Sequence, residues 1–282
     1  MRRGDSAVTT YAKGLTWGEG PRRHGGALWA SDPQGGKLWT DAGGTWEGLA
    51  LESQSNGLWF LPDGRLAAAI QRECRVGIWD GTGFGEYADL HAVATGPLGD
   101  MVGDSRGGLY VDDVGYAAHL GEEPKPGRIV YVTPAGDSVV AAEGIEFPNG
   151  IAVIDDGRTL VVAETWLQRL IAFDIDREGA LSNRRTYSDL REVVSPEARP
   201  DGICAAADGG VWVSTLHAHK LAHVRGADLV DTIDTGDAFP IACCLDADTG
   251  RLYATVAHTG GLPVMEAIAQ KQVQSTVEVF EV

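Results

Sequence analysis

Short apolar runs recur along the chain, and turn residues separate them. In the clearest stretch, residues 148–165, the run GIAVI is followed by the turn DDGR and then by the run TLVVAET. Val, Ile and Thr fill such runs, and Gly and Asp fill the connections, as antiparallel strands and tight turns require. No segment of helical length has a convincing helical period. The pattern therefore predicts an all-β chain.

The paired runs belong to a repeat that occurs six times. Each copy begins with a variable residue, called here the key position, and continues with an apolar run, a turn containing Gly and a second apolar run. Successive copies are roughly 40–50 residues apart, which is typical of propeller blades with four strands each. We therefore predict a six-bladed β-propeller. The key positions, expected to lie in register, are Glu19, Asn56, Gly99, Asn149, Asp201 and Ile241.

The two ends of the chain suggest how the ring closes. The last copy ends with TVEVFEV and lacks a fourth strand, whereas the strand-like run AVTTYAKGL, residues 7–15, belongs to no copy. We expect this N-terminal run to complete the last blade, because closure removes the exposed sheet edges. Pro and Gly are spread through the turns rather than concentrated in a linker, so we expect one domain over residues 1–282.

The first strand of each propeller blade lines the central channel, so the key positions should meet at one mouth of that channel. Glu19, Asn56, Asn149 and Asp201 would bring four oxygen-bearing side chains together there. Carboxylates held close together repel each other unless a cation neutralises them, and oxygen ligands suit Ca²⁺, Mg²⁺ or Mn²⁺. In the alternative reading, Asn and Asp before Gly only satisfy backbone groups where a strand begins.

The tripeptides EGP at 19–21, PNG at 148–150 and PDG at 200–202, in this order within a six-fold repeat, resemble the SMP-30/gluconolactonase/luciferin-regenerating-enzyme family. The resemblance covers nearly the whole chain. It implies a six-bladed propeller with one divalent cation in the channel, and many members hydrolyse lactones. It also implies that Glu19, Asn149 and Asp201 bind the cation and that Asp201 is in addition the general base. Ca²⁺ is the expected ion, with Mg²⁺, Mn²⁺ and Zn²⁺ as alternatives.

The third copy departs from the pattern of the sugar lactonases. Those members often carry Arg-x-Asn-Asp, where residues 97–100 here read Pro-Leu-Gly-Asp. The loops after the second strands carry aromatic side chains, which suggests a substrate less polar than a sugar. Blade-to-blade packing is the competing explanation for each of these aromatics. The residues predicted to contact the substrate are Asn56, Asp100, Tyr116, Trp166 and His217.

Composition narrows the range of partners. The formal net charge is −17, which argues against nucleic acid and anionic membranes, because both require clustered Lys and Arg. No apolar run is long enough to span a bilayer, and the N-terminal residues lack the apolar core of a signal peptide. The four cysteines have no CxxC spacing and are interpreted as reduced thiols of a cytoplasmic protein. Composition leaves the oligomeric state open.

The expected chemistry is metal-dependent hydrolysis of a lactone or related ester. A cation beside the lactone carbonyl would polarise it, and Asp201 would accept a proton from the attacking water. No GxSxG motif and no Cys/His arrangement suggests covalent catalysis. Two alternatives stay open: a non-catalytic propeller that binds calcium or another ligand, and a metal-free enzyme similar to strictosidine synthase. The full Glu/Asn/Asp set argues against the metal-free alternative.

Overall fold

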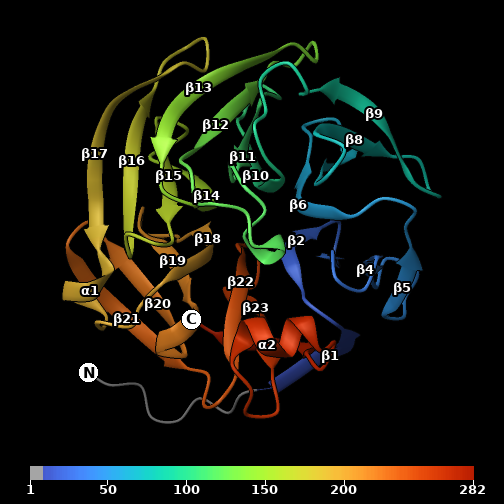
Figure 1. Cartoon of the computed structure of the whole chain (residues 1–282), viewed down its shortest axis with the longest axis vertical. Coiled ribbons are helices and arrows are strands. Elements are labelled where there is room, and N and C mark those ends of the chain that lie inside the picture. The colour runs from blue at the N-terminus through green and yellow to red at the C-terminus, as the bar shows by residue number, and fades with distance from the viewer. Residues whose placement is uncertain (1–8) are drawn as a thin grey trace.

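Each copy of the sequence repeat folds into one four-stranded antiparallel sheet, and six such sheets surround a central axis (Figure 1). The structure is a computed structural model that describes residues 9–282, apart from the side chain of residue 119. In blades one to five the strands follow chain order from the axis outward. The prediction of a six-bladed β-propeller is therefore confirmed.

Blade one contains β2 (Glu19–His24), β3 (Ala27–Asp32), β4 (Lys37–Thr40) and β5 (Glu47–Ala50). Blade two contains β6 (Ser55–Phe60), β7 (Leu66–Ile70), β8 (Arg75–Trp79) and β9 (Phe84–Asp89). Blade three contains β10 (Leu98–Gly103), β11 (Leu109–Asp113), β12 (Gly127–Val132) and β13 (Ser138–Ile145). Blade four contains β14 (Pro148–Ile154), β15 (Thr159–Glu164), β16 (Arg169–Ile175) and β17 (Leu181–Asp189). Blade five contains β18 (Pro200–Ala205), β19 (Val211–Thr215), β20 (Lys220–Arg225) and β21 (Asp228–Asp234).

The sixth blade joins the two ends of the described chain. Its strands are β22 (Phe239–Asp246), β23 (Arg251–His258), β24 (Gln274–Glu281) and, on the outer edge, β1 (Thr9–Leu15). The register places Thr9 opposite Val279 and Leu15 opposite Ser275, so the N-terminal strand closes the ring as predicted. Residues 7 and 8 of the predicted strand lie outside the described residues.

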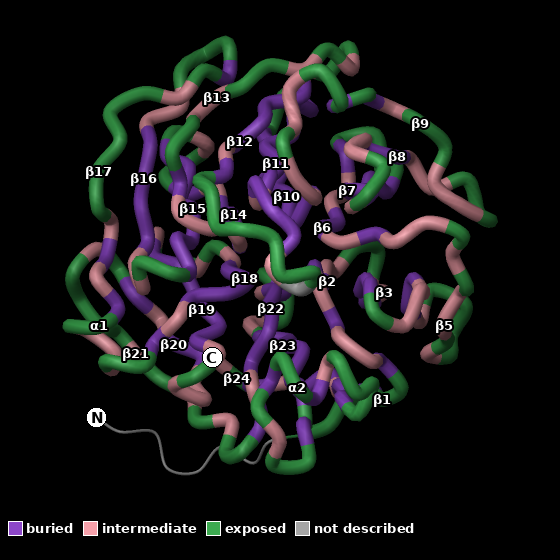
Figure 2. Tube along the Cα trace, viewed as in Figure 1, coloured by how far each residue is buried: buried purple, intermediate pink, exposed green. Residues whose placement is uncertain are grey.

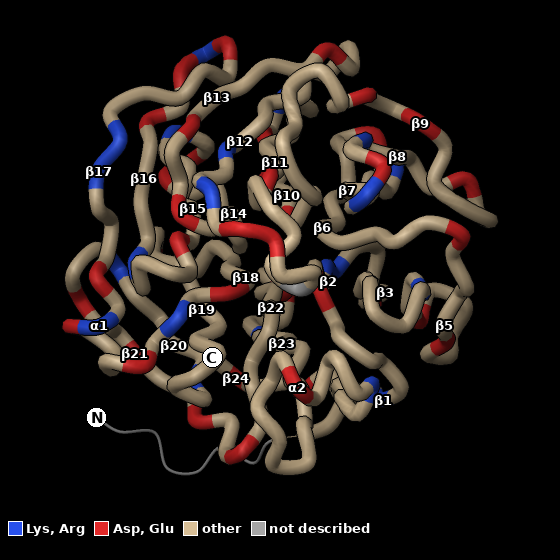
Figure 3. The backbone as a smooth tube through the Cα atoms, in the orientation of Figure 1, with Lys and Arg blue, Asp and Glu red and all other residues tan. Residues whose placement is uncertain are grey.

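Two short helices interrupt the connections, where the sequence suggested none. They are α1 (Leu190–Val193) and α2 (Val264–Ala269), and two single-turn 3₁₀ segments cover 118–120 and 216–218. Within residues 9–282 no helix is both long enough and apolar enough to cross a bilayer. Figure 3 shows acidic positions in every part of the ring, in keeping with the net charge of −17.

The hydrophobic core lies between the faces of neighbouring blades. One cluster joins Ala152 and Leu170 of blade four to Ile203 and Val211 of blade five, and a second joins blades two and three. Buried positions concentrate on the inner strands and exposed ones on the outer strands (Figure 2). Each fully buried Val, Leu or Ile contributes about 1.5–3 kcal/mol. The core therefore holds the inner strands in fixed positions around the axis.

Two glycines allow these inner strands to approach each other closely. A Cβ atom on Gly150 would lie 2.4 Å from the backbone nitrogen of Ile203, and one on Gly202 would lie 2.6 Å from Cβ of Ala242. Real Cβ atoms are not found this close to other atoms. The glycines of PNG and PDG are therefore required by contact between blades and not by a turn.

Candidate active site

Bulges at the start of the inner strands position Asn149 and Asp201. In blade four Pro148 pairs with Glu164 and Ile151 pairs with Val162, so one strand advances three residues while its partner advances two. Blade five repeats this bulge between Pro200 and Ile203. A bulge releases its residues from the alternation of the ladder and redirects their side chains. Here the bulges bring the side chain of Asn149 into a hydrogen bond with the Asp201 carboxylate.

Glu19 lies at the same channel mouth, but its position in the strand register differs from that of Asn149 and Asp201. It pairs with Ser31, so it corresponds to Pro148 in blade four, and Gly20 corresponds to Asn149. The expectation that all key positions lie in register is therefore wrong for Glu19. Gly20 adopts a φ of +50° in this bulge, where a side chain would be strained. Glutamate has one more methylene than aspartate, which compensates for the offset of one residue.

Burial and mutual repulsion make this mouth electrostatically unusual. Burial raises the pKa of Asp201 to about 7, and the nearby Asp100 carboxylate adds to the shift. Burial also raises the pKa of Glu19 well above its usual value, and the Asp201 carboxylate is the next cause. The only hydrogen bond found for the Glu19 side chain within residues 9–282 comes from Nε1 of Trp17, at 2.8 Å. The two carboxylates are thus close together without a cationic side chain bonded to either.

This donor set fits a hard divalent cation. The half-buried carboxylate of Glu19, the buried carboxylate of Asp201 and an amide supply oxygen ligands, and a cation among them would offset the burial and the acidic neighbours that raise both pKa values. Over residues 9–282, no group of three or more His, Cys, Asp or Glu side chains is arranged to hold a metal ion. The predicted ligand set contains only two such side chains, Glu19 and Asp201, because its third member, Asn149, is an amide.

Asp100 lies in the third-blade bulge, at the position that glycine occupies in blades four and five. Its carboxylate accepts hydrogen bonds from Nη2 of Arg22 at 3.2 Å, from its neighbour Met101 N at 2.8 Å and from Ile151 N at 3.4 Å. Protein groups therefore bond both oxygens, and the predicted contact of Asp100 with substrate stays a prediction.

Asp112 is an acidic neighbour that the sequence reading missed. It is fully buried on β11, and one carboxylate oxygen accepts a hydrogen bond from Asp100 N at 2.9 Å. The other oxygen has no hydrogen-bond partner among the described residues. Burial raises the pKa of Asp112 well above its usual value, and the Asp100 carboxylate adds to the shift. The acidic pair that ends the apolar run LYVDD was the available sequence signal.

Aromatic side chains form one wall beside Asn149. The Trp166 side chain is 42% exposed, and its Nε1 donates a hydrogen bond to the Tyr116 hydroxyl at 2.7 Å. The ring of Phe147, which the sequence reading did not single out, lies 4.7 Å from Trp166 and 5.7 Å from Tyr116. Tyr116 is buried, and its hydroxyl holds the indole of Trp166 through this hydrogen bond. Of the predicted contact residues, Trp166 and His217 are exposed, whereas Asp100 and Tyr116 are buried and Asn56 is half-buried.

The remaining predicted contacts lie apart from this wall. Asn56 is half-buried in the bulge of blade two, between Ser55 and Leu58. His217 is exposed in the connection after β19, and its ring centroid lies 6.3 Å from that of Phe239. Burial lowers the pKa of His217, and the Arg199 charge adds to the shift. A neutral imidazole at this position is therefore favoured.

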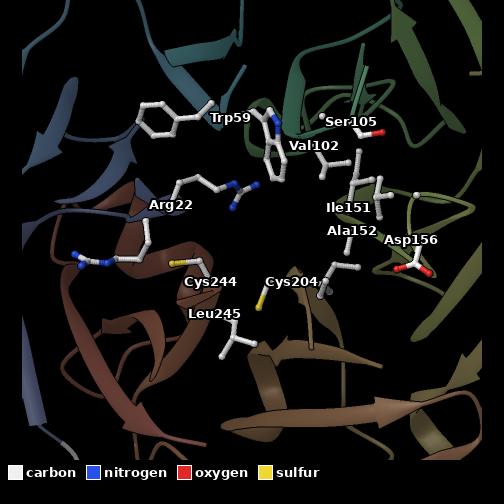
Figure 4. Close-up of a pocket in the computed structure, with 17 residues that line it drawn as sticks. Arg22, Trp59, Val102, Ser105, Ile151, Ala152, Asp156, Cys204, Cys244 and Leu245 are labelled. Atoms are coloured by element: carbon white, nitrogen blue, oxygen red, sulfur yellow. The ribbon is translucent and has the colours of Figure 1, made fainter. Parts of the chain in front are cut away.

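A cavity of about 420 Å³ lies at the other end of the channel (Figure 4). Its lining includes residues near the ends of the inner strands, among them Val102, Val153, Ala205 and Leu245. None of the predicted site residues lines it. The four steps along the strand from Asn149 to Val153 span about 13 Å. Arg22 reaches into this cavity, and Cys204 and Cys244 lie on its wall. The channel thus has two chemically different ends.

Four free cysteines are present, and two of them are close together. Sγ of Cys204 and Sγ of Cys243 are 3.6 Å apart on neighbouring inner strands. Burial raises the pKa of Cys244 to about 12, whereas the hydrogen bond with Cys243, followed by burial, raises the pKa of Cys204 well above its usual value. The thiols of Cys204 and Cys244 are therefore held in the protonated, weakly nucleophilic form.

Comparisons with known proteins agree with this architecture. The sequence model of the SMP-30/Gluconolactonase/LRE-like region matches residues 17–258. Regucalcin of Xenopus laevis is 25% identical over 142 residues, which cover 49% of this chain and 46% of that protein. Lactonase drp35 of Staphylococcus haemolyticus is 29% identical over 119 residues, covering 42% and 35%. The matches thus span less than half of the length of these curated relatives.

A solved structure extends the likeness over the whole ring. The calcium-binding protein regucalcin from Agrobacterium tumefaciens superposes with a TM-score of 0.77 at 18% identity, covering 96% of this chain and 95% of that one. At this level of identity the likeness shows a shared fold. The family profile and the shared fold therefore point to the same group of propellers.

Proposed function

Because the chain belongs to the SMP-30/gluconolactonase/LRE-like family, we propose that it hydrolyses a lactone or related ester at the channel mouth formed by Glu19, Asn149 and Asp201. The observation that carries this proposal is the pair of carboxylates formed by half-buried Glu19 and buried Asp201, whose pKa values are both raised and whose neighbour is an amide. A lactonase, drp35, is among the relatives that the chain matches.

In this proposal Glu19, Asn149 and Asp201 bind one divalent cation, with Ca²⁺ the first choice and Mg²⁺, Mn²⁺ and Zn²⁺ as alternatives. The bound cation would supply polarisation of the lactone carbonyl and stabilisation of the developing oxyanion. Oxygen ligands support a hard ion, and a structural neighbour is described as a calcium-binding protein.

Asp201 is the proposed general base. Its carboxylate takes a proton from water as the water oxygen bonds to the carbonyl carbon, and it returns a proton to the ring oxygen when the ring C–O bond breaks. The hydrogen bond from Asn149 orients the Asp201 carboxylate for this transfer.

The wall beside Asn149 supports a substrate less polar than a sugar lactone. The indole of Trp166 presents an apolar face, and Pro97 and Gly99 occupy positions where sugar lactonases often carry Arg and Asn. Apolar contact with the substrate body and a few polar groups at the reacting carbonyl are typical of small-molecule sites.

The direct test is acid release from a panel of lactones, measured on the purified protein before and after treatment with a chelator. We expect activity that is lost with the chelator and restored by one divalent cation. Hydrolysis that persists in the fully chelated protein would remove the cation from the proposal. No hydrolysis across aromatic, alkyl and sugar lactones, with metal bound, would favour the second candidate.

The second candidate is a non-catalytic propeller that binds calcium, and the shared fold with a calcium-binding protein favours it. In that case cation binding would stabilise the fold, and no lactone in the panel would be consumed. Thermal unfolding with and without cation, beside the acid-release assay, separates the two candidates.

A further inference from the structure

Arg199 lies directly before the Pro200–Asp201 pair and was not predicted as a site residue. Its backbone carbonyl accepts a hydrogen bond from Leu216 N at 3.0 Å, which ties it to the connection that carries His217. Its guanidinium carbon lies 5.3 Å from the centroid of the Trp166 ring. Its positive charge lowers the pKa of His217. The guanidinium therefore belongs to the wall beside the proposed reaction site.

Among the described residues, Arg199 has no acidic side chain as an ion-pair partner, in a protein with 40 acidic and 23 basic residues. Other arginines near buried carboxylates are paired: Arg22 with Asp100 at 3.2 Å and Arg169 with Glu164 at 2.6 Å. A guanidinium presents five donors and carries its charge at any physiological pH. An unpaired one at a half-buried position is free to bind an anionic ligand.

Neighbouring side chains hold this guanidinium in place. Trp166, over whose ring the guanidinium carbon lies, is fixed by the 2.7 Å hydrogen bond to Tyr116 and by the ring of Phe147. A guanidinium over an indole face is attracted by the π electrons of the ring, and this contact uses none of its N–H donors in a hydrogen bond. A carboxylate can accept two parallel hydrogen bonds from the planar edge of a guanidinium.

The Arg199–Trp166 pair is connected to the proposed cation ligands. Thr165, which precedes Trp166, donates a hydrogen bond to the Pro200 carbonyl at 2.8 Å and lies 3.5 Å from Nδ2 of Asn149. Arg199 is thus two residues from Asp201 in the chain. Trp166 directly follows Thr165, whose hydroxyl contacts Asn149. A small ring at the channel mouth would lie within reach of both Arg199 and Trp166.

We propose that Arg199 binds a carboxylate on the substrate, so that the natural substrate is a lactone carrying a free acid group. This inference rests on the proposed lactonase function and names its substrate class. One guanidinium balances one negative charge, which suits a carboxylate better than a doubly charged phosphate. Bidentate binding by a preorganised guanidinium also gives specificity, because a neutral analogue leaves its donors unmatched.

Two pairs of probes test the proposal. The first pair is a butyrolactone with a ring carboxylate and the same butyrolactone with a carboxamide. The second is a cyclopentanone with a ring carboxylate and its carboxamide, which bind but cannot be hydrolysed. We expect the wild type to prefer each carboxylate by about 10- to 100-fold, in kcat/KM for the lactones and in Kd for the ketones.

Arg199→Gln should abolish both preferences, because the difference between acid and amide depends on the charged guanidinium donors. Arg199→Lys keeps the charge without the planar edge and should retain only part of the preference. Arg185→Gln is the matched control, because this substitution removes the same charge at a different place. Arg185 lies on the outer strand β17 and pairs with Asp174 at 2.7 Å. This control variant should preserve both preferences.

The two assays separate this proposal from the proposed function. If neither lactone is hydrolysed but the ketone carboxylate binds in an Arg199-dependent way, the anion site stands and the lactonase function fails. If the lactones are hydrolysed with no preference for the carboxylate, or with a preference that Arg199→Gln retains, the carboxylate site is overturned. A stronger preference for a phosphorylated lactone would also overturn the substrate class.

Discussion

The guanidinium of Arg22 donates a hydrogen bond to the carboxylate of Asp100 across 3.2 Å, and only 11% and 9% of the two side chains are exposed. Arg22 also reaches into the cavity at the far end of the channel (Figure 4), whereas the charge of Asp100 acts on Glu19 and Asp201 at the near mouth. This ion pair therefore lies between the two ends of the channel. Through it, Arg22 places a positive charge beside Asp100, whose carboxylate acts on Glu19 and Asp201.

Removing Arg22 should destabilise the fold strongly. Arg22→Met would leave Asp100 buried and unpaired beside Glu19 and Asp201, at a cost of about 3–5 kcal/mol in the free energy of unfolding. The double variant Arg22→Met with Asp100→Asn should recover much of that loss, because it removes the stranded charge as well. Urea unfolding without divalent cations measures both. Additive losses in the double variant would show that the pair is not energetically coupled.

Replacing Asp201 by Asn should separate its two proposed roles. The variant keeps an oxygen ligand but loses the proton acceptor, so kcat should fall by roughly 10²–10⁴ even at saturating cation. Glu19→Gln loses the same charge but no proposed base, so excess cation should largely restore its rate. Steady-state kinetics over a cation titration make the comparison. Equal recovery of both variants would mean that Asp201 is a ligand only.

Cation binding should be stronger at higher pH. The folded, cation-free protein holds the proton of Asp201 up to a pKa of about 7, against an ordinary value of 3.8. Because the folded pKa is raised, this group makes the cation-free fold less stable as pH rises between those values. A cation displaces the proton, so Ca²⁺ should raise the melting temperature by several degrees near pH 8 and by much less near pH 5. Equal shifts at both pH values would contradict a carboxylate site.

Aromatic or alkyl lactones should be better substrates than gluconolactone. The exposed indole of Trp166 offers them a face, and the polar residues that would bind sugar hydroxyls are replaced in the third blade. Trp166→Ala should lower kcat/KM for an aromatic lactone by about tenfold or more and should change an unsubstituted lactone much less. A clear preference of the wild type for gluconolactone would refute this view of the wall.

Filling the far cavity should leave catalysis intact. Ala205 lines that cavity at the end of β18, four residues beyond Asp201. Ala205→Leu should keep kcat/KM within about twofold of wild type, because the substitution adds volume away from the proposed reaction site. A large loss of activity in a variant with an unchanged melting temperature would place the substrate at the far end of the channel instead.

The sequence by itself determined the architecture of this protein. Alternating apolar runs and turns specify strands through local physics, and the six-fold recurrence of the pattern specifies the blades. The unpaired run near the N-terminus indicated how the ring closes, and β1 pairs with β24 as expected. The channel mouth could also be located, because every copy begins its inner strand at the same side of the ring.

The tertiary structure decided what no single stretch of sequence contains. The offset of Glu19 follows from its pairing with Ser31, and the pairing of Arg22 with Asp100 joins residues 78 positions apart. The position of the Arg199 guanidinium over the Trp166 ring likewise depends on how blades four and five pack. Strand register, bulges and contacts between blades are set by the packing of the whole ring, so side-chain neighbours across the channel cannot be read from local patterns.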